Sequence, residues 1–146
     1  MPLNRKKILV LLVVLVAAMQ LVPIDRRNPP VTAEVAGARE FLAILKRSCF
    51  DCHSNETTWP WYSRIAPVSW MLAYDVYEGR EHLNFSHWGD YPGEKQVKLR
   101  KEIREEVDEG EMPPFQYYLV HREARLGNQD KEIIRRWATD GETPSR

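Results

Sequence analysis

The sequence predicts an all-α fold, on two observations. Apolar residues recur at the three- and four-residue spacing of amphipathic helices, and no segment alternates apolar and polar residues as a half-buried strand would. The chain has 146 residues, of which 43% are hydrophobic and 29% charged, as is typical of one globular domain. Its 21 basic residues balance its 21 acidic residues, so the composition indicates no nucleic-acid partner.

The first expected element is an N-terminal transmembrane helix. Residues 8–24 are apolar except for Gln20 and Pro23, and residues 5–7 are basic. A helix of this length reaches about 25 Å, slightly less than the ~30 Å hydrocarbon core of a bilayer. We therefore expect residues 1–27 to be a signal anchor or a signal peptide, with the uncleaved anchor favoured. Basic residues before the apolar segment predict that residues 8–24 cross the inner (cytoplasmic) membrane once and that the rest lies in the periplasm or outside.

The remaining chain is expected to form a short spacer, one helical domain and a tail. Residues 28–31 contain two adjacent prolines, which favour a stiff extended backbone. The folded domain is expected over residues 32–140 and the tail over residues 141–146. Its helices are predicted at residues 32–47, 67–79, 96–109 and 130–138, with Thr32 and Asn128 as N-caps and with Gly79, Gly110 and Gly141 as stops.

The two cysteines of the chain lie in the sequence Cys49-Phe50-Asp51-Cys52-His53. This is the spacing of covalent c-type haem attachment, because both thiols reach the edge of one macrocycle and the adjacent imidazole reaches its iron. The motif therefore predicts one covalently bound haem c, held by Cys49 and Cys52, with His53 as an iron ligand.

Other uses of the two thiols fit the sequence less well. A thioredoxin-like redox pair would follow a strand, whereas a helix is expected before Cys49. A zinc site could add His82 and His87, but the 29 residues between Cys52 and His82 exceed the usual finger spacing of about 12–15. Two incidental thiols beside a surface histidine are the remaining alternative.

Met112 is the expected second iron ligand. It lies directly after the third predicted helix, where two following prolines hold the backbone extended. His82, His87 and His121 are the alternatives, and an open coordination position is another. A thioether opposite an imidazole would raise the reduction potential relative to two imidazoles.

Aromatic residues that follow the cysteine motif are expected to form the haem pocket. Trp59, Trp61, Tyr62 and Trp70 would exclude water, and the indole N–H groups would donate to the haem propionates. Arg64 is expected to pair with a propionate. An ordinary aromatic core is the alternative interpretation.

Several short strings resemble the bacterial haem-binding-domain family of small, membrane-anchored proteins similar to class I cytochrome c. They are Asn28-Pro29-Pro30-Val31, Cys52 to Thr57, Trp59 to Tyr62, Pro67 to Trp70, His82 to Ser86 and Met112-Pro113-Pro114. Gly37 and Phe41 in the first predicted helix and Trp137 in the last resemble the crossing helix contact of cytochrome c. The resemblance implies a cytochrome c-like helical domain around a single covalent haem, an N-terminal membrane segment and a periplasmic location.

These features together predict a periplasmic, membrane-anchored monohaem c-type cytochrome that transfers single electrons between redox partner proteins. No general base, nucleophile or second metal site accompanies the motif, so an enzyme is not expected. The alternatives are a haem-based sensor or small-molecule binder with a labile sixth ligand, and a peroxidase with His82 or His121 as distal base. Residues 28–146 hold 16 basic and 20 acidic residues, a net charge near −4 that weakly favours a basic partner.

Overall fold

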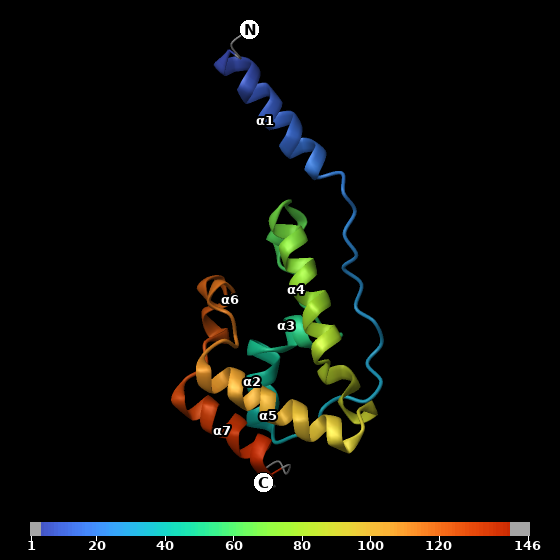
Figure 1. Ribbon diagram of the computed structural model, residues 1–146, viewed down its shortest axis with the longest axis vertical. Coiled ribbons are helices and arrows are strands. Elements are labelled where there is room, and N and C mark those ends of the chain that lie inside the picture. Colours follow the sequence, from blue (N-terminus) through green and yellow to red (C-terminus); the bar gives the residue numbers. More distant parts are fainter. Residues whose placement is uncertain (1–3, 141–146) are drawn as a thin grey trace.

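The computed structural model describes residues 4–140, which form seven α-helices and three short 3-10 helices, with no strand among them (Figure 1). The all-α prediction is therefore confirmed for this part of the chain. The tail and the stop expected at Gly141 lie outside it. The elements are α1 (Arg5–Met19), α2 (Arg39–Ser48), α3 (Phe50–His53), η1 (Trp61–Arg64), α4 (Val68–His82), η2 (Phe85–Asp90), α5 (Gly93–Glu109), α6 (Phe115–Val120), η3 (Arg122–Ala124) and α7 (Asn128–Asp140).

Helix α1 projects away from the rest of the molecule (Figure 1) and buries none of its side chains. It is shorter than expected, because it ends at Met19 rather than continuing to residue 24. The side chain of the next residue, Gln20, bonds to the backbone of Ala66: its amide nitrogen lies 3.3 Å from the Ala66 oxygen, and its oxygen lies 3.0 Å from the Ala66 nitrogen. Within residues 4–140, no helix has both the length and the apolar character needed to cross a membrane.

Residues 20–38, here called the strap, connect α1 to α2 and run alongside α4 (Figure 1). The helix expected from residue 32 begins only at Arg39. Residues 32–38 are not helical, because the backbone N–H groups of Thr32 and Ala33 donate to the Ser86 carbonyl at 3.1 and 3.0 Å. Thr32 is therefore not an N-cap. Its hydroxyl donates instead to Asp90 at 2.6 Å.

The hydrophobic core lies where α2 and α7 meet, with η2 and α5 completing it. Phe41 of α2 stacks on Trp137 of α7, with ring centroids 4.5 Å apart, so these two residues make the helix contact expected of them. Gly37 lies in the strap, outside the helix. Twelve buried residues make up this core: Val35, Phe41, Ile44, Leu45, Phe50, Leu83, Phe85, Trp88, Leu99, Val107, Ile134 and Trp137.

The other helix boundaries follow local signals in part. Gly110 ends α5 in the left-handed conformation, with φ 84°, as a glycine readily does. Gly79 does not end α4, which continues to His82. Helix α5 starts at Gly93, three residues earlier than expected, and Asn128 is the first residue of α7 rather than its cap.

Candidate functional site

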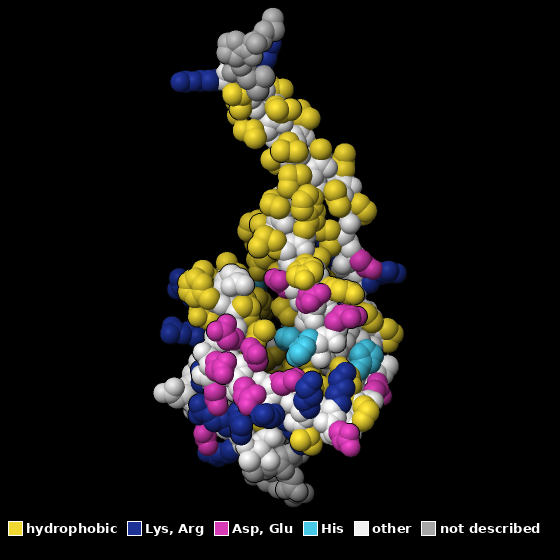
Figure 2. Space-filling model, in the orientation of Figure 1, with side chains coloured by type: hydrophobic (Ala, Val, Ile, Leu, Met, Phe, Trp, Pro, Cys, Tyr) yellow, Lys and Arg dark blue, Asp and Glu magenta, His cyan; other side chains and the backbone are white. Residues whose placement is uncertain are grey.

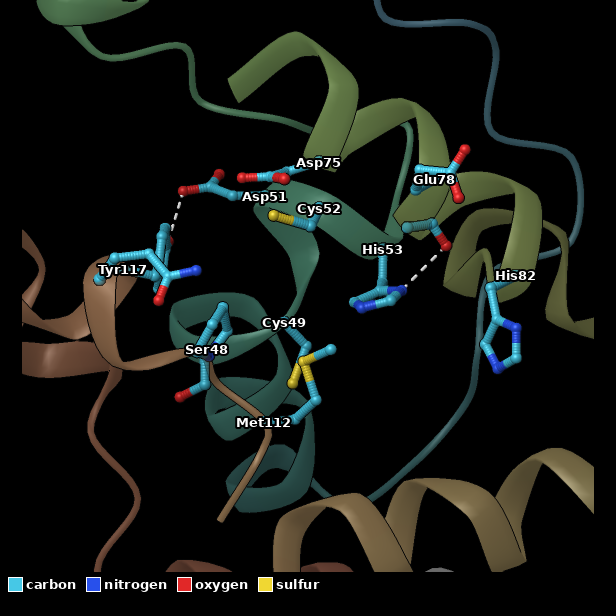
Figure 3. A pocket seen from close by; sticks show the side chains of 13 residues that line it. Ser48, Cys49, Asp51, Cys52, His53, Asp75, Glu78, His82, Met112 and Tyr117 are labelled. Carbon is cyan, nitrogen blue, oxygen red and sulfur yellow. Dashed lines mark hydrogen bonds between the residues drawn. The ribbon is translucent and has the colours of Figure 1, made fainter. Parts of the chain in front are cut away.

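The cysteine motif forms one tight helical turn directly after α2. The backbone N–H groups of Cys52 and His53 both donate to the Cys49 carbonyl, at 3.2 and 2.9 Å. The Ser54 hydroxyl closes the turn by donating to the Phe50 carbonyl at 2.8 Å. The turn brings the side chains of Cys49, Cys52 and His53 to the same cavity (Figure 3).

This cavity has a volume of about 410 Å³ and lies between α3, the C-terminal half of α4 and the segment that leads into α6. A smaller cavity of about 80 Å³ continues from it toward α5, and Ser48, Cys49, His53, His82 and Met112 line both. The hydroxyl of Ser48 is buried there without a hydrogen-bond partner in the described part of the chain. The larger cavity is lined by Ser48, Cys49, Asp51, Cys52, His53, Asp75, Glu78, Gly79, His82, Met112, Pro114, Gln116 and Tyr117.

His53 is oriented by the backbone of α4. Its Nδ1 lies 2.9 Å from the Gly79 carbonyl and 3.2 Å from the Leu83 carbonyl, so Nδ1 must carry the proton that is donated to them (Figure 3). Burial is the main effect on the ring and lowers the pKa of His53, which favours the neutral imidazole. Nε2 then keeps a free lone pair, the arrangement in which histidine ligates a metal.

The His53 arrangement depends on a close approach between α3 and α4. A Cβ at Gly79 would lie 2.5 Å from the Cys52 carbonyl oxygen, a distance that real Cβ atoms essentially never show. The absence of a side chain at Gly79 therefore lets its own carbonyl reach His53.

The two cysteines are half-buried, and their thiols are un-ionised. Burial raises the pKa of Cys49 to about 12 and that of Cys52 to about 12. A reactive dithiol pair would instead have at least one lowered thiol pKa, close to or below neutral pH. The environment therefore does not fit a thioredoxin-like redox pair.

Met112 and His82 reach the same cavity from other elements. The Met112 backbone N–H donates to the Glu106 carbonyl at 3.2 Å, which holds this residue just beyond the end of α5, and its side chain is 39% exposed. His82 lies in the last turn of α4, with its Nε2 3.5 Å from a carboxylate oxygen of Glu102. Figure 3 shows both side chains at the cavity.

The other two histidines considered as ligands line neither cavity. Nε2 of His87 accepts from Asn55 at 3.1 Å, and its Nδ1 lies 2.7 Å from the Thr32 hydroxyl. Nε2 of His121 lies 2.6 Å from the Tyr62 hydroxyl. Each ring is therefore used in a hydrogen bond, although His121 lines a third, very small cavity of about 10 Å³ together with Cys52.

The structure also identifies cavity residues that sequence reasoning missed. The Tyr117 hydroxyl in α6 donates to the Asp51 carboxylate at 2.7 Å. The pKa of Tyr117 is raised, mainly because the side chain is desolvated. Asp75 and Glu78 come from α4, and burial raises the pKa of Asp75. Positions 75, 78 and 82 are three and four residues apart and therefore lie on one face of a helix. This spacing could have indicated from the sequence that Asp75 and Glu78 lie on the same side of α4 as His82.

The five residues expected to wall a haem do not line either of these two cavities, although Tyr62 lines a third, of about 10 Å³, together with Cys52 and Tyr117. Trp61 is 75% exposed and Arg64 is exposed, both in η1. Trp59 lines a separate cavity between the strap and α4, Tyr62 packs toward His121, and Trp70 is half-buried at the start of α4. The reason is the path of the chain, which after Thr57 runs to the N-terminal end of α4, while the C-terminal half of α4 forms the wall beside the thiols.

A family model described as a haem-binding domain matches residues 13–140. Comparisons with curated proteins and with solved structures gave no match. The matched range includes the cysteine motif, the α4 face and the Met112 segment, which together line the cavity.

Proposed function

Because the chain belongs to the haem-binding domain family, we propose that it is a membrane-attached, periplasmic monohaem protein of the cytochrome c type. In this proposal it carries single electrons between redox partner proteins and catalyses no reaction of its own. Cys49 and Cys52 would hold the haem covalently, and His53 and Met112 would be the iron ligands that the protein supplies.

The observation that carries this proposal is the convergence of four side chains on one cavity. Two thiols, one imidazole with a free Nε2 and one thioether line it together, although Met112 lies 59 positions after His53. This donor set fits haem c, because thiols can form the two thioether bonds while imidazole and thioether are established axial ligands. The buried Ser48 hydroxyl, which has no hydrogen-bond partner within residues 4–140, also fits a cavity that takes a further group.

Bound haem supplies a reversible one-electron change at iron. The protein residues orient and enclose it: the Gly79 and Leu83 carbonyls hold the His53 ring, and the α4 face covers one side of the cavity. With Met112 as second ligand beside His53, the protein would supply two iron ligands and leave no open coordination position. Such a site favours electron transfer over binding of a substrate at iron.

A haem-based sensor is the second candidate, and the exposure of Met112 is the observation that favours it. A ligand that is 39% exposed on a non-helical segment can be displaced by a small molecule more easily than a buried one. A peroxidase with His82 or His121 as distal base has no comparable support: His121 lines neither cavity and bonds to Tyr62, and His82, which lines both, has its Nε2 3.5 Å from a Glu102 carboxylate oxygen.

The membrane and periplasmic parts of the proposal rest on α1 and on the cysteine motif. Nine consecutive apolar residues, 8–16, are between 41% and 64% exposed, and basic residues precede them. Such a surface requires an apolar environment, so we propose that residues 8–24 attach the protein to the inner membrane.

Expression of the full chain in a host that exports proteins and attaches haem tests this function. We expect the intact mass to increase by one haem, a pyridine haemochrome spectrum typical of two thioether bonds, and reversible one-electron reduction. Carbon monoxide should bind the reduced protein slowly or not at all. Rapid binding would favour the sensor, and colourless protein of unmodified mass would contradict both.

A further inference from the structure

The end of the domain nearest α1 exposes apolar side chains on two separate elements. Figure 2 shows hydrophobic side chains gathered over the tip of α4 and over α6, on the side of the domain toward α1. We call these residues the apolar end: Trp61, Ile65, Val68, Met71, Phe115, Leu119 and Val120.

The apolar end also differs in charge from the rest of the domain. Residues 57–74 and 112–122 contain no Asp or Glu, and they are the two longest such stretches after Asp25. Each contains one arginine, Arg64 and Arg122. The remainder of residues 28–146 is acidic overall, so an apolar, weakly basic surface at one end is a local feature that suits anionic lipid headgroups.

Hydrogen bonds connect the apolar end to the residues that follow α1. The Gln20 side chain bonds to both backbone groups of Ala66, at 3.0 and 3.3 Å, and Arg26 donates to the Ser63 carbonyl at 3.0 Å. The Tyr62 hydroxyl lies 2.6 Å from Nε2 of His121, which joins η1 to the chain just after α6. Residues 61–71 are therefore held next to the first residue after α1, and α6 is connected to them through the Tyr62–His121 contact.

We propose that the apolar end is a second membrane-contact surface, seated in the interfacial region of the same anionic phospholipid bilayer that takes up α1. The inference rests on the membrane attachment in the proposed function and adds a second contact to it. Since Gln20 directly follows α1 and bonds to Ala66, a bilayer surface at the end of α1 meets η1 at the same depth.

The chemistry of the exposed groups suits that depth. Trp61 has an apolar ring and an N–H donor, the combination found at membrane–water interfaces. Arg64 lies beside the exposed Ile65 and Val68 and can pair with lipid phosphate. Helix α1, at 15 residues, is about 22 Å long, so a further apolar contact at its end would add to its own hydrophobic attachment.

Photolabelling by lipid tests the proposal on the full, haem-loaded chain. The protein is reconstituted into phosphatidylethanolamine–phosphatidylglycerol vesicles that contain a diazirine phospholipid, and labelled peptides are mapped by mass spectrometry. We expect labels in residues 8–24, in residues 61–71 and in α6. The double variant Trp61→Ser/Met71→Ser should lose the label at 61–71 and keep it at 8–24.

A matched control and a second variant keep the result interpretable. Val97→Ser replaces a side chain of α5 that is 68% exposed and lies outside the apolar end, so labelling should not change. Leu119→Ser/Val120→Ser tests α6 independently and should remove only its own label. Haem content, read by pyridine haemochrome in every sample, reports whether each variant is folded and loaded.

The possible outcomes separate this proposal from the function. Labels confined to residues 8–24 would overturn the second contact and leave the membrane attachment intact. Residues 61–71 shielded from lipid in a dimer would assign the surface to a second copy and also overturn it. No label in residues 8–24 would remove the membrane attachment itself, whatever the haem content.

Discussion

At the scale of single residues, Met112 decides between an electron carrier and a sensor. Replacement by alanine in the haem-loaded protein should abolish the weak sulfur-to-iron charge-transfer absorption and lower the reduction potential, because a neutral thioether favours ferrous iron. Axial ligands tune haem potentials over about 0.8 V, so we expect a decrease on the order of 0.1 V. A spectroelectrochemical titration measures both effects, and carbon monoxide should then bind rapidly.

The control for Met112→Ala is His82→Ala, since His82 lines the same two cavities from α4. It should leave the charge-transfer band and the potential near their original values. If instead His82→Ala removes the axial signature and Met112→Ala does not, His82 is the sixth ligand and Met112 only lines the cavity.

The residues of the candidate site differ in how far the sequence could predict them. Cys49, Cys52 and His53 form a contiguous motif whose chemistry requires no knowledge of the fold, and Met112 is marked by the prolines that follow it. Tyr117 reaches the cavity only through tertiary structure, by its hydrogen bond to Asp51. Tryptophan content indicates apolar contacts but not their direction, so the aromatic wall stays a prediction, and its residues line neither of the two cavities.

At the scale of elements, α3 packs so closely against α4 that one added carbon atom should destabilise the contact. Gly79→Ala should lower the free energy of unfolding by about 2 kcal/mol, because the added Cβ would lie 2.5 Å from the Cys52 carbonyl oxygen and overpacking typically costs 1–3 kcal/mol. Helix propensity alone predicts the opposite sign, since alanine stabilises a helix interior by ~1 kcal/mol relative to glycine. Denaturant titration of the haem-loaded protein measures the change.

Gly93→Ala is the matched control, because no atom lies within 4 Å of a Cβ at that position in the first turn of α5. It should be neutral or slightly stabilising. A stabilised Gly79→Ala variant would contradict the close approach of α4 to the motif, and with it the explanation of how Gly79 orients His53.

The element boundaries show where local patterns stop being informative. Gly110 was correctly expected to end a helix, because its left-handed conformation depends on that residue alone. Residues 32–38 were wrongly expected to be helical, although the buried Val35 lies three positions before Ala38 and seven before Leu42, which are helical spacings. Their N–H groups bond to the carbonyls of Phe85 and Ser86, about fifty residues later, and no periodicity reveals such a pairing.

At the scale of the whole molecule, the domain has two parts that are stabilised in different ways. The core around Phe41 and Trp137 is closed by direct side-chain packing of α2 and α7. Around the cavity, by contrast, α6 buries none of its residues, and Tyr117 reaches the motif mainly through one hydrogen bond. The second part therefore depends on what fills the cavity.

Hydrogen–deuterium exchange on the Cys49→Ala/Cys52→Ala variant, purified free of haem, tests this division. We expect the amides of residues 110–121 to exchange much faster than in the haem-loaded protein, because filling of the cavity stabilises this segment. The amides of α2 and α7 should remain protected, since the Phe41–Trp137 stack needs no added group. Uniform loss of protection would mean that the haem supports the whole domain. Unchanged exchange of residues 110–121 would mean that α6 is held by the protein alone, and that the cavity beside Cys49 and Cys52 is not completed by a bound group.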